Sequence, residues 1–374
     1  MPNVILVWFD MRILVFNWRC WLNPFGGGAE RFTYEVFSRL VRRGCSVTWF
    51  TSRFPGCLDE EVVDGVRLIR AGGRFTVYSE ARKYYIKYFK DGFDIIIDEI
   101  NTKPFMTVDF VRDTPIAALI HQLAREFWSY EMFFPLSVIG RYFLEDRWLR
   151  KYCSIPTITV SESTKCDLED LGFREIYVVS EGLNIKPLGE LPEKEEKPTI
   201  IFLGRLKRVK QPEHALKAFK HVKEEIPDAR LWIIGDGPLR KRLERRAFNG
   251  VRFFGRVSEE EKINLLRRAH VLVFPGVREG WGLTVIEAAS QGTPTVAYDV
   301  PGLRDSVRHM ETGLLTPAND VERLAENLIK ILRNSELRIA FSKRALAYSR
   351  LFNWDNTADQ VFNILKSVSD SSDG

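Results

Sequence analysis

Short apolar runs alternate with amphipathic stretches along almost the whole chain. Arg12–Asn17 is typical of a buried strand, and Ala29–Arg43 has the periodicity of a helix that ends at Gly44. Further strands are predicted at Ser46–Thr51, Phe93–Asp98, Pro115–Ile120, Thr157–Val160 and Ile176–Val179. This order of strand, helix and strand indicates a parallel sheet with helices on both faces.

The alternation stops at a polar, charged segment bracketed by prolines, residues 188–198, which we interpret as a linker. Strands resume at Thr199–Leu203, Arg230–Ile234, Val251–Phe254, Val271–Phe274 and Thr295–Tyr298. Helices are predicted to begin near Gln211, Leu239, Ser258 and Thr284, and to cover Val321–Arg333, Glu336–Ser349 and Trp354–Ser367. We therefore predict an α/β protein of two doubly wound domains, with ligands in a cleft between them, beyond the carboxyl ends of the strands.

Composition narrows the class of protein. A length of 374 residues allows two domains, and 45% hydrophobic with 28% charged residues is typical of a soluble globular chain. The 55 basic and 50 acidic residues give a net charge of +5, which permits anionic ligands but is not typical of a nucleic-acid binder. The five cysteines are scattered without a Cys-x-x-Cys pair, which favours free thiols in a reducing compartment over structural zinc.

The N-terminal segment Val4–Phe16 is apolar enough to suggest a signal peptide, but Asp10 and Arg12 interrupt it and no cleavage site follows. Met11 fits the start of the first strand, so the natural start is left open between Met1 and Met11. No uncharged apolar run reaches the ~18 residues of a membrane span. We expect a cytoplasmic protein, and contact with the inner face of the cell membrane remains an alternative.

The sequence lacks the motifs of several common enzyme classes. The glycine turns at Gly26–Arg31 and Gly235–Arg240 miss the third glycine of the dinucleotide fingerprint, and Thr51–Arg53 ends the second strand without an acidic residue. A nicotinamide dehydrogenase is therefore disfavoured. The sequence also lacks a phosphate-binding P-loop, His-Glu-x-x-His, Gly-x-Ser-x-Gly and Asp-x-Asp, so it indicates no divalent metal on a diphosphate.

The segment 278–294 carries the strongest functional pattern. Its two glycines let the backbone approach a ligand, and the free amides of a helix beginning near Thr284 would bind an anion. Glu279 lies before that helix, and Glu287 is predicted in its first turn, where it could bind hydroxyl groups. Thr284 and Glu287 also fit a capping box, which is a purely structural alternative.

Three weaker patterns follow other predicted strands. In the loop after Gly204, Arg205 and Lys210 could hold a diphosphate and stabilise it as a leaving group, although a solvated basic loop is the simpler alternative. Gly26–Gly28 opens a helix and offers another anion site, or an ordinary tight turn. His121 follows Pro115–Ile120 and fits either a catalytic or a structural role.

Taken in this order, the motifs resemble those of the retaining group 1 (family 4) glycosyltransferases, which share the two-domain GT-B fold. The similarity extends from Met11 to about Leu365. The matching features are the glycine loop with Glu30, His121, Ser161–Lys165, Gly182–Asn184, Gly204–Lys210, Gly235–Pro238, and Glu279 with Glu287 followed by Gly292 and Pro294. Two features depart from the family pattern: Pro301–Arg304 contains one glycine where many members have a pair, and Leu183-Asn184 stands where Val-Asp is commoner.

The resemblance implies a role for each matched residue. Arg205 and Lys210 would bind the donor diphosphate, Glu287 the ribose and Glu279 the donor sugar, while His121 would act from the acceptor-side domain. The remaining implied donor-site residues are Gly27, Gly28, Gly204, Gly235, Asp236, Gly237, Arg256, Gly280, Gly282, Leu283 and Thr284. The implied domains are 1–187 on the acceptor side, a linker 188–198, a donor domain 199–352, and a C-terminal helix 353–374 that packs back on the first domain.

The implied reaction moves a hexose from a UDP-, GDP- or ADP-sugar to an acceptor hydroxyl with retention, and without metal or cofactor. The acceptor is left open among glycans, lipid-linked molecules and small molecules. Phe127–Tyr152 and Phe75–Lys90 mix aromatic and basic residues, which suits an anionic membrane surface or helices that merely cover the first sheet. Alternatives are a non-catalytic GT-B subunit that binds nucleotide sugars or acts as a scaffold, and a nucleotide-sugar epimerase.

Overall fold

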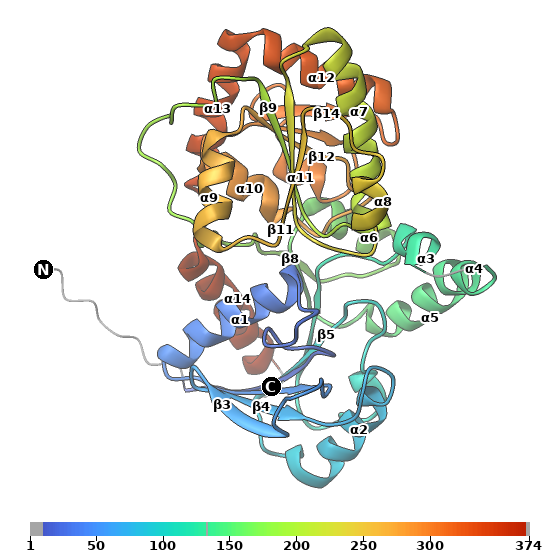
Figure 1. The fold of residues 1–374 in the computed structure, drawn as a ribbon. Helices are drawn as coiled ribbons and strands as arrows, with labels where there is room; N and C mark the ends of the chain where they lie inside the picture. Colours follow the sequence, from blue (N-terminus) through green and yellow to red (C-terminus); the bar gives the residue numbers. More distant parts are fainter. Residues whose placement is uncertain (1–9, 132–133, 372–374) are drawn as a thin grey trace, which may run out of the picture. The chain divides into compact units, whose positions relative to one another are not determined.

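The computed structural model describes residues 10–131 and 134–371, and in it the chain divides into two compact units (Figure 1). The first unit comprises the chain up to Arg125, Val138–Gly182 and the chain from Trp354; the second comprises Glu126–Ser137 and Leu183–Asn353. Two details differ from the predicted domains. The unit boundary falls at Gly182 rather than 187, and Glu126–Ser137 groups with the second unit. The choice between Met1 and Met11 as the natural start is not tested, because residues 1–9 lie outside the described part of the chain.

The first unit contains an eight-stranded sheet in the order β3-β4-β2-β1-β5-β6-β7-β8. The strands are β1 (Arg12–Phe16), β2 (Ser46–Thr51), β3 (Glu60–Val63), β4 (Val66–Arg70), β5 (Ile95–Glu99), β6 (Ile116–Ile120), β7 (Thr157–Thr159) and β8 (Ile176–Val178). All are parallel except β3, which pairs antiparallel with β4. This hairpin was not predicted. Its turn residues Asp64 and Gly65 have φ values of 52° and 79°, the left-handed backbone that tight hairpins need.

The second unit contains a six-stranded, fully parallel sheet in the order β11-β10-β9-β12-β13-β14. The strands are β9 (Thr199–Leu203), β10 (Arg230–Ile234), β11 (Val251–Gly255), β12 (Val271–Phe274), β13 (Thr295–Tyr298) and β14 (Gly313–Thr316). β14 was not predicted. β9 is buried at every position, as expected of a central strand covered by helices on both faces.

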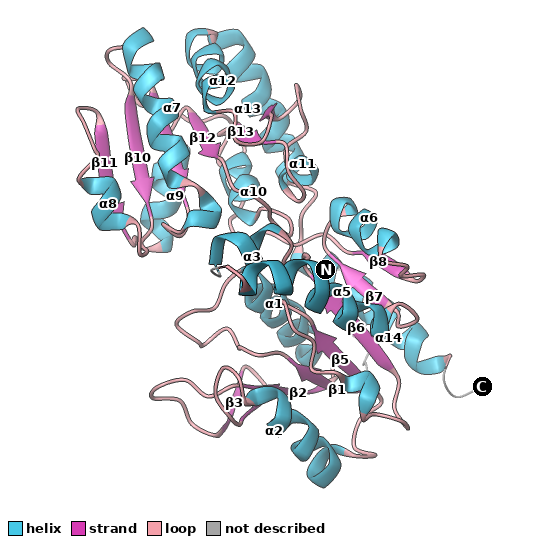
Figure 2. Ribbon diagram, turned by 90° about the vertical axis from the view of Figure 1, so that its right-hand side faces the viewer, coloured by secondary structure: helices cyan, strands magenta, loops and turns pink. Residues whose placement is uncertain are grey.

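Helices surround both sheets (Figure 2). Those of the first half of the chain are α1 (Gly28–Arg42), α2 (Val77–Tyr84), η1 (Tyr85–Phe89), η2 (Thr107–Asp109), α3 (Glu126–Glu131), α4 (Leu136–Ile139), η3 (Gly140–Leu144), α5 (Glu145–Leu149), η4 (Arg150–Tyr152) and α6 (Glu162–Asp170). The others are η5 (Arg208–Lys210), α7 (Pro212–Glu225), α8 (Arg240–Glu244), α9 (Glu259–Arg268), α10 (Leu283–Ser290), α11 (Leu303–Ser306), α12 (Val321–Arg333), α13 (Ser335–Ser349) and α14 (Trp354–Asp370). Among the described residues, no helix is both long and apolar enough to cross a membrane.

Each sheet has its own hydrophobic core. Phe16, Phe50 and Phe105 belong to one core in the first unit, whereas Phe202 and Phe219 belong to the core of the second. These side chains come from strands, from a covering helix and, for Phe105, from the loop after β5. The carboxyl ends of the strands in each unit are therefore fixed by a packed interior, which positions the loops that follow.

The C-terminal helix α14 packs within the first unit, against α1. Trp354 lies edge-on to Phe32, with ring centroids 5.8 Å apart, and the Arg39 guanidinium lies 3.0 Å from the Asp355 carboxylate. A Cβ atom placed on Gly182 would lie 2.5 Å from the ring and backbone of Trp354. A glycine is therefore required at 182 for the helix to approach this closely.

The segment 188–198 has no helix or strand, but it is held along the second unit. The Leu188 amide donates to the Ser290 carbonyl at 3.0 Å, and the Lys194 ammonium donates to the Thr293 hydroxyl at 2.9 Å. The Glu195 carboxylate forms ion pairs with Arg230 and Arg268. The segment is thus part of the surface of the second unit rather than a free tether.

Candidate functional site

The loops after β9 and β10 pack backbone against backbone in the second unit. A Cβ atom on Gly235 would lie 2.0 Å from the Gly204 carbonyl oxygen, and one on Gly237 would lie 2.6 Å from the Leu206 carbonyl oxygen. Both glycines also have positive φ, at 121° and 159°. Because no side chain fits at either position, the two loops pack closely and expose backbone that a ligand can approach.

The next loop along this edge pairs a cation with a carboxylate. The Lys210 ammonium donates a hydrogen bond to the Glu279 carboxylate, and the Val277 amide donates to the Val209 carbonyl at 3.0 Å. The exposed fractions of these two charged side chains are 19% and 13%. The structure therefore brings together two predicted site residues that are far apart in the sequence.

Helix α10 begins with unpaired backbone amides. Its N-cap is Gly282, with φ of 103°, and no side chain caps it. Among the described residues, the amides of Gly282, Leu283 and Thr284 find no hydrogen-bond acceptor. Such amides, together with the positive end of the helix dipole, form an anion site.

The capping-box alternative for Thr284 and Glu287 is wrong, because Thr284 is the second residue of α10 and caps nothing. The prediction that Glu287 lies in the first turn of this helix is also wrong, because it is the fifth residue of α10. Its carboxylate accepts a hydrogen bond from Lys262 of α9 at 2.8 Å, and Lys262 also pairs with Glu259 at 2.7 Å. Burial lowers the pKa of Lys262, but the two carboxylates outweigh this effect and raise it above the usual value. Lys262 was not predicted as a site residue.

The other predicted residues of this unit lie at the same edge of the sheet. Arg205 is exposed and has no ionic partner among the described residues. The Asp236 carboxylate accepts from the Gly237 amide at 2.7 Å and lies 3.6 Å from the Arg240 guanidinium. Arg256 follows β11 and is exposed, and Gly280 lies between Glu279 and the start of α10. The Asp236 carboxylate is thus occupied by contacts with neighbouring residues, whereas the guanidinium of Arg205 is available to an anion.

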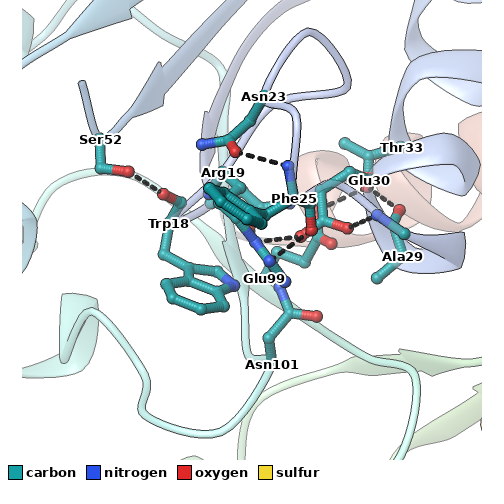
Figure 3. A network of polar contacts seen from close by, with 12 residues as sticks. Trp18, Arg19, Asn23, Phe25, Ala29, Glu30, Thr33, Ser52, Glu99 and Asn101 are labelled. Atoms are coloured by element: carbon teal, nitrogen blue, oxygen red, sulfur yellow. Dashed lines mark hydrogen bonds and ion pairs between the residues drawn. The ribbon is translucent and has the colours of Figure 1, made fainter. Parts of the chain in front are cut away.

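The predicted glycine loop of the first unit is closed by its own carboxylate (Figure 3). Glu30 accepts from the Gly27 amide at 2.6 Å and from the Arg19 guanidinium at 2.9 Å. Gly27 is the N-cap of α1, and Gly28 is its first residue. Since the Gly27 amide is already bonded, only later amides of this helix start could contribute to an anion site.

His121 lies buried at the end of β6, 6% exposed. Its Nε2 is 3.6 Å from the Glu99 carboxylate, its Nδ1 is 3.9 Å from the Glu181 carboxylate, and Phe32 lies edge-on at 5.1 Å. Burial lowers the pKa of His121, but Glu99 and Glu181 outweigh it and raise the pKa above the usual value. For the Glu99 carboxyl group, burial has the opposite effect and raises the pKa. Among the described residues neither ring nitrogen has a partner within hydrogen-bond distance, although each lies within ion-pair distance of a carboxylate.

Two family models match the chain in succession. Glycosyltransferase Family 4 matches residues 26–186, and Glycosyl transferases group 1 matches residues 188–347. The chain belongs to the group 1 (family 4) glycosyltransferases. The resemblance stated from the motifs is therefore confirmed.

Curated relatives of this chain share about a third of its residues or fewer. A phosphatidyl-myo-inositol mannosyltransferase of Mycobacterium leprae is 30% identical over 58% of this chain and 60% of its own length. A D-inositol 3-phosphate glycosyltransferase of Corynebacterium urealyticum is 32% identical over 45% of this chain and 43% of its own. The aligned part therefore spans less than two thirds of either relative. A glycogen synthase of Mycobacterium tuberculosis is 26% identical over 93% of this chain and 92% of its own length.

Solved glycosyltransferase structures share the fold over nearly the whole chain. Sucrose-phosphate synthase of Thermosynechococcus elongatus has a TM-score of 0.76 at 21% identity, covering 97% of this chain and all of that one (100%). The Anabaena protein HepE in complex with UDP-glucose has a TM-score of 0.71 at 16% identity, covering 96% and 100%. The predicted fold class, two doubly wound α/β domains of the GT-B type, is confirmed. The roles assigned to individual site residues stay predictions.

Proposed function

We propose that this glycosyltransferase moves a hexose from a nucleotide diphosphate sugar to an acceptor hydroxyl, with retention of anomeric configuration and without a metal ion or other cofactor. The donor would be a UDP-, GDP- or ADP-sugar. The observation that carries the proposal is the edge of the second sheet. There the amides of Gly282, Leu283 and Thr284, unpaired among the described residues, lie at the start of α10, whose N-cap follows Glu279, the partner of Lys210, by three residues. The UDP-glucose complex of HepE, a protein of the same fold, supports a nucleotide sugar as the ligand.

In the proposed mechanism, the second unit supplies positive charge to the leaving group. Arg205 and Lys210 bind the two phosphates, and the amides at the start of α10 bind one of them, so that negative charge developing on the diphosphate is stabilised. Lys210 exchanges its contact with Glu279 for one with phosphate, which leaves that carboxylate to bind the sugar hydroxyls. Glu287, oriented by Lys262, binds the ribose.

The first unit is proposed to bind the acceptor. His121 lies at the carboxyl edge of its sheet, with buried nitrogens that have no partner among the described residues. Because the neighbouring carboxylates stabilise its protonated form, the imidazole would donate a hydrogen bond to a hydroxyl of the donor sugar or acceptor. The leaving phosphate then accepts the proton of the attacking hydroxyl, because no side chain is assigned as a covalent nucleophile.

Contact with the inner surface of a membrane is a further part of the proposal. Ile86 and Tyr88 are each 60% exposed in η1, beside the basic residues Lys87 and Lys90. Apolar side chains among cations favour an anionic lipid surface. Flotation with anionic vesicles tests this: wild type should float at low salt and Ile86→Glu should not, and a wild-type protein that stays at the bottom of the gradient rules the contact out.

The transferase proposal is tested by turnover of Arg205→Ala and Lys210→Ala on the donor identified by thermal shift. Loss of one leaving-group cation should lower kcat by roughly 10²-fold. Arg208→Ala, an exposed cation of the same loop, is the matched control and should retain wild-type turnover. Near-normal turnover of either active-site variant overturns the assignment.

Four further readouts separate the alternatives. The anomeric coupling constant of the product reports retention, and activity that survives a chelator reports metal independence. Conversion of the donor sugar in the absence of any acceptor would indicate an epimerase. Binding of nucleotide with neither hydrolysis nor transfer would indicate a non-catalytic subunit.

A further inference from the structure

A group of cations and aromatic rings lies at the carboxyl edge of the first sheet, beside the glycine loop. It is built by the loops after three parallel strands, β1, β4 and β5, and by the helices α2 and α5. We call it the aromatic–basic cluster; its members are Trp18, Arg74, Tyr78, Lys103 and Trp148. Ligands of doubly wound sheets bind at this edge.

Two cations of the cluster have no carboxylate. Arg74 lies over the Trp18 and Phe75 rings at 5.8 and 5.4 Å, and Lys103 lies over the Tyr78 and Trp148 rings at 4.6 and 5.9 Å. Neither forms an ion pair with any carboxylate of the described residues. Arg74 is exposed, whereas Lys103 is half-buried.

Other basic residues on the same sheet are neutralised. Arg53, after β2, pairs with Asp59 at 2.6 Å, and Arg70, in β4, pairs with Glu61 at 2.6 Å. Against these ion pairs, Arg74 and Lys103 stand out as uncompensated charge at a binding edge. Two positive charges in one cluster repel each other, so an anion bound between them would be stabilised.

A hydrogen bond joins the loops beside the two cations. Arg74 lies over the Trp18 ring, and the neighbouring Asn17 side chain accepts from the Asn101 side chain at 3.1 Å. Asn101 lies in the loop that carries Lys103, whose ammonium lies over the Tyr78 ring at 4.6 Å. The cations therefore belong to one cluster, rather than to two separate surface contacts.

Two buried hydrogen-bond donors in the loop after β1 have no partner among the described residues. Asn17 is fully buried, and its Oδ1 accepts from the Asn101 side chain at 3.1 Å, yet its Nδ2 has no partner among the described residues. The indole Nε1 of Trp18 is likewise buried and unpaired. Figure 3 shows Trp18 and Asn101 beside the loop that leads into α1. Unsatisfied buried donors are costly, and a bound molecule rich in oxygen would satisfy them.

We propose that the aromatic–basic cluster binds the phosphate group of a phosphorylated acceptor, with Arg74 and Lys103 holding the phosphate and Asn17 and Trp18 donating to acceptor oxygens. This inference rests on the proposed function and names the acceptor class for it. A guanidinium binds phosphate through two parallel hydrogen bonds, and a lysine adds a point charge. The half-buried Trp148 ring adds an aromatic surface on which a sugar or polyol ring would pack.

The phosphate could belong to a soluble ester or to a lipid headgroup, and the test has one arm for each. In the soluble arm, inorganic phosphate and glycerol 3-phosphate are titrated into the full chain at low salt, and the indole N–H signal of Trp18 is followed by NMR. Trp18→Phe assigns that signal. In the lipid arm, phosphatidylcholine vesicles with and without phosphatidic acid are used in flotation.

Arg74→Ala and Lys103→Ala should each weaken binding at least ~10-fold in one arm. Arg174→Ala is the matched control, since Arg174 is an exposed cation that precedes β8, at the opposite edge of the sheet. Loss in the soluble arm supports a soluble acceptor, and loss in the vesicle arm alone supports a lipid headgroup. If both variants bind like Arg174→Ala in both arms, the inference is wrong.

Failure of the proposed function is distinguishable from failure of this inference. Thermal stabilisation by UDP, GDP or ADP reports the second unit alone, and it should be unchanged in Arg74→Ala and Lys103→Ala. A chain that binds nucleotide but shows no phosphate effect at Trp18 retains the transferase proposal and loses the phosphorylated acceptor. A chain that no nucleotide stabilises loses the transferase proposal itself.

Discussion

The ammonium group of Lys262 donates a hydrogen bond to the carboxylate of Glu287 at 2.8 Å, joining two helices that lie side by side in the second unit. Lys262 is only 13% exposed, so the contact is shielded from solvent. It fixes the carboxylate that the mechanism assigns to the ribose.

Replacement of Lys262 by methionine should therefore weaken donor binding. We expect the KM for the donor to rise about tenfold with a small change in kcat, because the variant loses the orientation of Glu287 rather than a contact with the leaving group. Steady-state kinetics on the identified donor measure both constants. Lys343→Met, an exposed lysine of α13, is the control; an unchanged KM in Lys262→Met would contradict the assigned role.

Gly235→Ala should destabilise the second unit by at least ~2 kcal/mol. The added methyl group would lie 2.0 Å from the Gly204 carbonyl oxygen, at a residue whose φ of 121° already disfavours a side chain. Urea unfolding followed by fluorescence measures the change in free energy. Gly189→Ala is the control, since nothing lies within 4 Å of its added Cβ, and equal stability of the two variants would refute the prediction.

The imidazole of His121 should stay protonated to a higher pH than an exposed histidine. Its pKa is raised by Glu99 and Glu181 despite burial, so its charged form stabilises the fold below the ordinary pKa and this contribution is lost as pH rises through the raised value. NMR titration of the five histidines follows each ring, with His221 as an exposed reference. Glu99→Gln should lower the pKa of His121, and a pKa that does not move would argue against the pairing.

Lys194 should make the unfolding free energy depend on pH. Burial lowers its pKa to about 7, whereas an unfolded lysine titrates near ~10.4. Between these values the unfolded chain binds more protons, so the contribution of this group to stability rises with pH and is smallest below pH 7. Chemical denaturation of wild type and Lys194→Met at several pH values measures it: the difference should shift in favour of wild type toward pH 10, and parallel curves would show that Lys194 titrates normally.

Most of the fold was predictable because the apolar runs of central strands are local signals. β2 and β10 were predicted with their observed bounds, and the start of α9 follows its Ser258 cap. The β3–β4 hairpin was missed although Asp64-Gly65 is a known turn signal, since the edge strand β3 is charged and half-exposed. β14 is only four residues long and offers no periodicity.

The site was predictable only in part. Glycines and charged residues after strands could be recognised one loop at a time, which identified Lys210, Glu279 and Glu287. Which of them meet depends on the packing of loops that are distant in the sequence. The Lys262–Glu287 pair and the closure of the Gly27 amide by Glu30 needed the folded chain, because each is decided by side-chain geometry that residue spacing leaves open.

The position of α14 has a consequence for synthesis on the ribosome. The strand framework of the first unit is translated early, but the helix that covers Phe32 emerges only after the whole second unit has been made. Until then Phe32 and the crevice beside Gly182 lack their cover and are open to other apolar surfaces. The nascent first unit therefore exposes apolar surface until α14 is made, and such exposure favours aggregation.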